Sequence, residues 1–140
     1  MAHGNIIDGL HLIVDGNVSD PSLFAEENLK QMFEELVQAL DMQLIHGPIF
    51  KDVELDASKL SGNAFQDEGG ISGYAMISTS HMSIHCWPLR QTFMADLFSC
   101  KMFNHDKAMG ILDKFGVGKT SAKSGFAATA CSSVLPALIS

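Results

Sequence analysis

The stretch from Ile71 to Cys100 constrains the fold more than any other part of the chain, because apolar and polar residues alternate along it. A period near two is typical of half-buried β-strands, which turn successive side chains to opposite faces. The short polar segment from Ser78 to His81 fits a turn or a tight strand junction. The apolar runs are Tyr74-Met76-Ile77, Met82-Ile84-Cys86 and Phe93-Met94-Leu97-Phe98. The pattern therefore predicts three consecutive strands.

Two amphipathic helices are expected on either side of this stretch. The first runs from about Ser22 to Leu40, after an N-cap and a helix-starting proline in Ser19-Asp20-Pro21. Its predicted apolar face consists of Leu29, Met32, Phe33, Leu36, Val37 and Leu40. The second runs from Asn104, a plausible cap, to Phe115.

Further strands are predicted before and after the first helix. Ile6 to Val14 reads as a strand closed by Asp15-Gly16-Asn17, and Met42 to Val53 reads as a strand interrupted at Gly47-Pro48. Asp56 to Gly70 reads as a loop. The order of elements predicts an α+β fold, a two-layer sandwich with helices on one face of an antiparallel sheet.

Composition places the chain among globular proteins. The 140 residues fit a single domain (1–140), with a core over residues 6–115 and a Gly/Ser/Ala-rich tail over residues 116–140. A formal net charge of −7 argues against nucleic acid and anionic membranes as partners. The start of the chain lacks the features of a signal peptide, and no apolar run would span a membrane, so a cytoplasmic protein is expected.

The histidines and cysteines do not predict a metal site or a disulfide framework. His81 and His85 lie four residues apart, which in a strand is about 13 Å, too far for one metal ion. The three cysteines show no paired spacing. Cys86 and Cys131 are expected to serve packing.

The polar junction offers one chemistry that a plain turn does not. Ser80 in a strained turn could attack the carbonyl of Thr79, and an acyl shift followed by β-elimination would cleave the chain and leave an N-terminal pyruvoyl group. Such a group forms a Schiff base with a substrate amine and withdraws electrons from a breaking carboxylate bond. His85 or Ser72 could act as the acid or base, and Cys100 could donate a proton. The pattern alone favours a simple turn, and it also allows a core histidine at position 85 and a buried cysteine at position 100.

Three blocks of sequence carry a family resemblance. They are Gly70-Ile71-Ser72-Gly73, Ser80-His81-Met82-Ser83-Ile84-His85-Cys86-Trp87-Pro88 and Asp96-Leu97-Phe98-Ser99-Cys100. They resemble, at the same spacing, the G-[VI]-S-G, E-S-H-x-x-I-H-T-W-P-E and D-[VL]-F-[TS]-C blocks of the prokaryotic S-adenosylmethionine decarboxylases. Asp8-Gly9-Leu10-His11-Leu12 resembles the family's G-x-H-L strand, and the resemblance covers roughly residues 6–115.

The resemblance implies a self-cleaving proenzyme whose pyruvoyl cofactor derives from Ser80, with cleavage between Thr79 and Ser80. It implies that His85 promotes cleavage with the help of Ser72, and that Cys100 protonates the decarboxylated carbon. Members of the family have the two-layer sandwich fold and pair as homodimers with active sites at the protomer interface. Their small-molecule product, decarboxylated S-adenosylmethionine, supplies aminopropyl groups for spermidine.

The chain departs from the family pattern where substrate is recognised. Thr79 replaces the glutamate before the serine, and Leu89 replaces the glutamate that binds the ribose hydroxyls. The family's adenine-stacking aromatic residue aligns with Gln66, so Phe65, one position away, is the candidate for that contact. Trp87 is a second aromatic candidate for substrate contact, although it also fits a packed strand end.

Three functional hypotheses follow. The first is a pyruvoyl-dependent S-adenosylmethionine decarboxylase with altered ribose and adenine contacts. The second, motivated by Leu89, is the same chemistry on another amino acid such as arginine or ornithine. The third, motivated by Thr79, is a family member that never cleaves and acts as a binding or regulatory protein.

Overall fold

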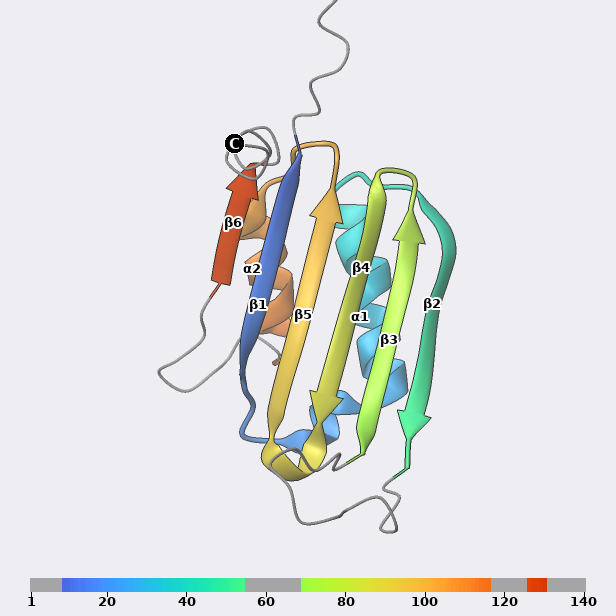
Figure 1. The fold of residues 1–140 in the computed structure, drawn as a ribbon, viewed down its shortest axis with the longest axis vertical. Helices are drawn as coiled ribbons and strands as arrows, with labels where there is room; N and C mark the ends of the chain where they lie inside the picture. Colours follow the sequence, from blue (N-terminus) through green and yellow to red (C-terminus); the bar gives the residue numbers. More distant parts are fainter. Residues whose placement is uncertain (1–8, 55–68, 117–125, 131–140) are drawn as a thin grey trace, which may run out of the picture.

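The computed structural model describes residues 9–54, 69–116 and the backbone of residues 126–130. Its strands form one antiparallel sheet in the order β2-β3-β4-β5-β1-β6. They are β1 (Leu10–Asn17), β2 (Leu44–Val53), β3 (Gly70–Ile77), β4 (Ser80–Trp87), β5 (Thr92–Ser99) and β6 (Phe126–Ala130). The helices are α1 (Glu26–Ala39) and α2 (His105–Lys114), with short 3-10 helices η1 (Pro21–Phe24) and η3 (Pro88–Arg90). Both long helices lie behind the sheet in Figure 1, which confirms the predicted α+β sandwich.

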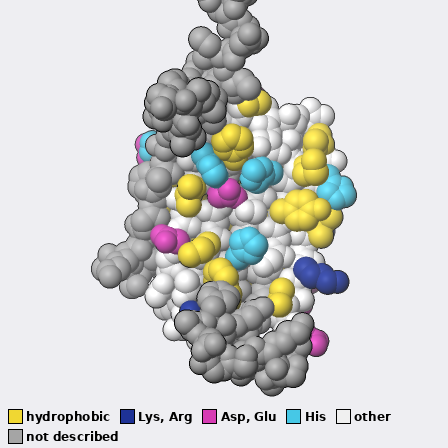
Figure 2. All heavy atoms as spheres, viewed as in Figure 1, with side chains coloured by type: hydrophobic (Ala, Val, Ile, Leu, Met, Phe, Trp, Pro, Cys, Tyr) yellow, Lys and Arg dark blue, Asp and Glu magenta, His cyan; other side chains and the backbone are white. Residues whose placement is uncertain are grey.

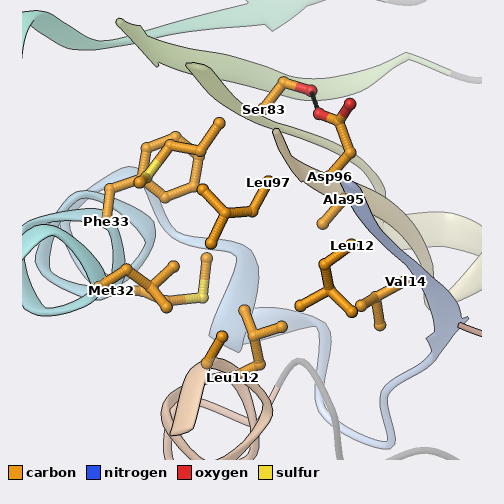
Figure 3. A pocket seen from close by; sticks show the side chains of 12 residues that line it. Leu12, Val14, Met32, Phe33, Ser83, Ala95, Asp96, Leu97 and Leu112 are labelled. Carbon is orange, nitrogen blue, oxygen red and sulfur yellow. Dashed lines mark hydrogen bonds between the residues drawn. The ribbon is translucent and has the colours of Figure 1, made fainter. Parts of the chain in front are cut away.

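The core lies between the sheet and the helices, as the alternation predicted. In β4 the buried side chains are Met82, Ile84 and Cys86, while the residues between them are more exposed. The buried residues of α1 are Leu29, Met32, Phe33 and Leu36. A hollow of about 20 Å³ remains among these side chains, and Figure 3 shows the residues that line it. It has room for one water molecule at most, so it is a packing gap and not a substrate site.

Several element boundaries differ from the predicted ones. The strand expected to close at Asp15 continues to Asn17, because β1 stays paired with β5 as far as the Asn17–Thr92 pair. The first helix is preceded by η1, where the side chain of Asp20 accepts a hydrogen bond from the backbone N–H of Ser22. The predicted interruption at Gly47-Pro48 is an irregularity within one strand and not a break, since β2 runs from Leu44 to Val53 and its pairing register with β3 shifts on both sides of His46.

The sixth strand was not predicted. β6 pairs antiparallel with β1 along one edge of the sheet, from Leu10–Ala130 to Val14–Phe126. Its sequence, FAATA, lacks the alternation that marks the other strands. The remainder of the predicted tail and nearly all of the loop from Asp56 lie outside the described residues.

The front face of the sheet in Figure 1 carries no helix among the described elements, and we call it the open face. Apolar side chains are exposed on it, including Ile13 (46%), Tyr74 (42%), Met76 (44%) and Met94 (52%). Figure 2 shows hydrophobic groups interspersed with histidine and acidic side chains on this face. Within the described helices, none is long and apolar enough to cross a membrane. The open face is where the candidate site residues gather.

Candidate active site

The proposed cleavage point lies in a two-residue turn between adjacent strands. β3 ends at Ile77 and β4 begins at Ser80, and these two residues pair across the turn. Ser80 and His81, predicted as part of the turn, are instead the first residues of β4. Ser80 has a φ of 155°. Non-glycine residues rarely adopt such a backbone, at a cost of about 1–3 kcal/mol, so the strain lies in the backbone of Ser80, directly after the bond to Thr79.

The end of β5 holds Thr79 at both its carbonyl and its side chain. The backbone N–H of Cys100 donates to the carbonyl oxygen of Thr79 at 2.8 Å. The hydroxyl of Ser99, which is fully buried, donates to the Thr79 hydroxyl at 2.9 Å and accepts from the N–H of Lys101 at 3.0 Å. Threonine in place of the family's glutamate is therefore accommodated by a hydroxyl partner.

Ser80 contacts its neighbour along the chain. The Ser80 hydroxyl lies 3.1 Å from Nδ1 of His81, and Nε2 of His81 lies 3.6 Å from a carboxylate oxygen of Asp96. Cys100 follows the last residue of β5 and is exposed. The turn thus brings together a strained serine, a hydrogen-bonded carbonyl, an imidazole and an accessible thiol.

A second group of predicted residues lies farther along β4. Ser72 and His85 are paired across β3 and β4, and the Ser72 hydroxyl lies 2.8 Å from Nδ1 of His85. The ring of Trp87 stacks on that of His85, with centroids 6.3 Å apart. An open hollow of about 220 Å³ on this face is lined by Ile49, Lys51, Ser72, Gly73, Tyr74, Ser83 and His85.

Within one chain, the residues at the serine turn and those around His85 lie far apart. His85 lies five residues from Ser80 on the same strand, which corresponds to about 16 Å along β4. The structure therefore brings Thr79, Ser80 and Cys100 together at one end, and Ser72, His85 and Trp87 together at the other. Phe65 lies outside the described residues.

The charged centre of the open face was not predicted as part of the site. Asp96 on β5 accepts hydrogen bonds from Nε2 of His11 at 2.7 Å and from the hydroxyl of Ser83. Partial burial acts to raise the pKa of Asp96, but these two hydrogen bonds and the charges of His81 and His11 hold that pKa below its ordinary value. The carboxylate is therefore a stable negative charge beside the serine turn. Only the strand register, which brings β1, β4 and β5 together, could have revealed it.

Cys86 and Leu89 do not contribute reactive groups to the candidate site. Burial raises the pKa of the Cys86 thiol to about 12, so it is neither a nucleophile nor a proton donor at neutral pH. Leu89, at the position of the family's ribose-binding glutamate, is 77% exposed on η3. No carboxylate from this position is available to a ribose.

The architecture defines an α+β sandwich, and a solved structure shares this fold. The crystal structure of the adenosylmethionine decarboxylase from Aquifex aeolicus matches with a TM-score of 0.61. The match covers 88% of this chain and 89% of that chain at 20% sequence identity. At that identity the likeness shows a common fold.

The sequence comparisons identify the family. The family model for S-adenosylmethionine decarboxylase matches residues 10–124, and the chain belongs to this family. The S-adenosylmethionine decarboxylase proenzyme of Hydrogenobaculum is 30% identical over 94 residues, which is 66% of this chain and 59% of that protein. The arginine decarboxylase proenzyme of Ignicoccus hospitalis is 32% identical over 82 residues, 58% of this chain and 49% of that protein. The matched regions thus span about half to three fifths of these relatives. The resemblance drawn from the sequence blocks is confirmed.

Proposed function

We propose that this chain is the proenzyme of a pyruvoyl-dependent decarboxylase that cleaves itself between Thr79 and Ser80 and acts on S-adenosylmethionine. The observation that carries the proposal is the geometry of the serine turn. The carbonyl to be attacked already accepts a hydrogen bond from the Cys100 N–H, and the next residue holds an unusual φ of 155°.

Self-cleavage begins with attack of the Ser80 hydroxyl oxygen on the carbonyl carbon of Thr79. Negative charge develops on the carbonyl oxygen, and the Cys100 N–H is positioned to stabilise it. The peptide C–N bond then breaks, leaving an ester and a free amine. Loss of the Ser80 α-proton expels the Thr79 carboxylate and leaves dehydroalanine. This enamine tautomerises to an imine, which water hydrolyses to the pyruvoyl group and ammonia. The strain at Ser80 favours the first of these steps because it is released when the peptide bond opens.

The residues around the turn fit a pyruvoyl group at position 80. The group supplies an electron-withdrawing carbonyl that accepts the substrate amine and takes up the electron pair left by carbon dioxide. Cys100 is exposed next to the turn, so its thiol can deliver a proton to the decarboxylated carbon.

We further propose that the active protein is a homodimer built through the open face. The Ser72–His85 pair lies about 16 Å from Ser80 within one chain, so its predicted role in cleavage needs a second copy. In such a dimer, the open faces of two chains pack against each other, and a two-fold axis lies in the plane between them, perpendicular to β4. This axis would place the partner's β4 antiparallel to β4 across the interface. The His85 end of each chain would then face the Ser80 end of the other. The exposed apolar side chains of this face support such burial.

Arginine or ornithine is the alternative substrate. The exposed Leu89 supplies no acceptor for ribose hydroxyls, and a relative that is 32% identical is an arginine decarboxylase proenzyme. If S-adenosylmethionine is the substrate, Leu89→Glu should lower its KM by about tenfold or more, since a charge-assisted hydrogen bond contributes about 1.5–3 kcal/mol. The same substitution should leave the KM for arginine unchanged.

Intact mass spectrometry followed by an assay of carbon dioxide release tests the function. We expect two fragments, residues 1–79 and residues 80–140, the second blocked by a pyruvoyl group. Ser80→Ala should remain one uncleaved chain without activity, while Cys100→Ala should cleave but turn over poorly. Release from S-adenosylmethionine but neither amino acid supports the first substrate, and release from arginine or ornithine alone supports the second. A single uncleaved mass after long incubation would instead support a non-enzymatic family member.

Complementation tests the dimer. Ser80→Ala and His85→Ala chains, each inactive alone, are co-expressed. Activity in the mixture supports a site shared across the interface, because the mixed dimer joins Ser80 of one chain to His85 of the other. An inactive mixture, in a sample that sedimentation velocity shows to contain mixed dimers, places both residues in the same chain and contradicts the proposal.

A further inference from the structure

A connected set of polar side chains runs across the open face to the serine turn. Asp96 lies at its centre, bonded to His11 of β1 and Ser83 of β4, and Figure 3 shows the Ser83–Asp96 bond at the edge of the core hollow. Figure 2 shows histidine and acidic groups gathered over these strands. Nε2 of His81 lies 3.6 Å from the same Asp96 oxygen that His11 contacts, and its Nδ1 lies 3.1 Å from the Ser80 hydroxyl.

We propose that His81 is the base that removes the Ser80 hydroxyl proton in the acyl shift, with Asp96 as its positioning residue. The inference rests on the proposed self-cleavage and deepens it, because it assigns the first proton transfer to a residue of the same chain. His81 touches the reacting hydroxyl, whereas His85 lies about 16 Å along the strand.

The surroundings of His81 suit this role. To accept a proton at Nδ1, the neutral ring must carry its hydrogen on Nε2, the atom that faces Asp96. The ring of Phe98 lies beside both imidazoles, with centroids 5.9 Å from His81 and 4.9 Å from His11. These contacts and the carboxylate favour the ring orientation that places Nδ1 on the Ser80 hydroxyl, as an oriented base requires.

The proton balance closes within the turn. As the Ser80 oxygen bonds to the Thr79 carbonyl carbon, its proton moves to Nδ1 of His81. When the peptide C–N bond breaks, the same proton moves from His81 to the departing Ser80 nitrogen. The ester and the free amine form with no net gain or loss of protons, so no co-reactant is needed.

The arrangement makes the cleavage rate depend on pH. A general base accepts a proton only in its neutral form, so the cleavage rate should rise with pH. The groups that face it are Asp96 on β5 and, beyond that carboxylate, His11 on β1, while its partner on β3 is the uncharged Met76. Asp96→Asn removes the carboxylate that faces Nε2 of His81, so it should move the rising limb of the profile. A merely structural Asp96 would not move that limb.

The test is the first-order rate of self-cleavage of the full chain, followed by intact mass from pH 5 to 9. His81→Ala and His81→Gln should both slow cleavage by about a hundredfold or more, the usual contribution of a general base. Added imidazole should restore part of the rate in His81→Ala and none in Ser80→Ala. His105→Ala replaces a partly exposed histidine at the start of α2, is the matched control and should cleave at the wild-type rate. Circular dichroism melting confirms that each variant folds.

The outcomes separate this inference from the proposed function. If the wild-type chain cleaves and both His81 variants cleave as fast, the inference is overturned and the decarboxylase proposal stands. The inference is also overturned if both His81 variants cleave slowly, imidazole restores no activity and Asp96→Asn leaves the pH profile unchanged. His81 would then only shape the turn. If the wild-type chain never cleaves, the proposed function fails and this inference fails with it.

Discussion

Replacing Ser80 by glycine and by alanine separates the backbone strain at the cleavage point from the loss of the hydroxyl. Both variants lack the nucleophile, so the intact chain can be measured in each. A φ of 155° costs a residue with a Cβ about 1–3 kcal/mol. Glycine avoids that cost but loses about 0.5–1 kcal/mol relative to alanine through its larger freedom in the unfolded chain. The difference predicts that Ser80→Gly is more stable than Ser80→Ala by about 1 kcal/mol.

Urea unfolding at a fixed protein concentration measures this difference. The chain has a single tryptophan, Trp87, whose fluorescence reports on the end of β4, and circular dichroism provides a second signal. With an m-value near 2 kcal/mol/M, a difference of about 1 kcal/mol moves the midpoint by about 0.5 M.

Ser83 provides the matched control on the same strand. Its φ is not positive, and its hydroxyl is lost in both substitutions. Ser83→Gly should therefore be less stable than Ser83→Ala by about 0.5–1 kcal/mol, the reverse of the order at Ser80. Equal stability of the two Ser80 variants, or the same order at both positions, would refute the strain argument.

Three further predictions follow from the described contacts. In the folded protein, an alkylating reagent should label Cys100 and spare Cys86, as peptide mass mapping would show. The reason is that burial raises the pKa of the Cys86 thiol to about 12. Similar labelling of both cysteines would contradict this prediction. Ser99→Ala should lower the free energy of unfolding by about 1–3 kcal/mol and slow cleavage, because the Thr79 hydroxyl and the N–H of Lys101 each lose a hydrogen-bond partner. Unchanged urea midpoints would argue against it. The pKa of Asp96 is lowered on folding, so its stabilisation is complete above its ordinary pKa of 3.8 and is lost as pH falls through the lowered value. The stability gap between wild type and Asp96→Asn should therefore hold from neutral pH to about pH 4 and close below it, as a series of urea titrations would show.

The sheet and its covering helices could be predicted because alternation and helical periodicity are local signals. Met82, Ile84 and Cys86 mark one face of β4 by their spacing alone, and the structure buries all three. The strand FAATA could not be predicted in this way, because alanine and threonine at successive positions do not distinguish an inner face from an outer one.

The polar set on the open face could not be predicted because it depends on register. His11 and Asp96 are 85 residues apart in the chain, and only the pairing of β1 with β5 brings them together. The sequence blocks drew attention to Ser80 and His85 by their match to a family. The contact between Ser80 and His81, in contrast, arises from the backbone geometry at the start of β4.

The separation of the two histidines along β4 limits how the active site can be assembled. The register that pairs Ser72 with His85 also pairs Ile77 with Ser80, and a slip of one residue would turn every core side chain of β4 outward. Ser80 and His85 both belong to β4, so no sliding of one strand past another changes their separation within one chain. If His81 is the base for the acyl shift, the first-order rate of that step should not change when the protein is diluted below the dissociation constant of the dimer. His85 would then serve a later step. A rate that falls with dilution would instead mean that the shift needs the second chain.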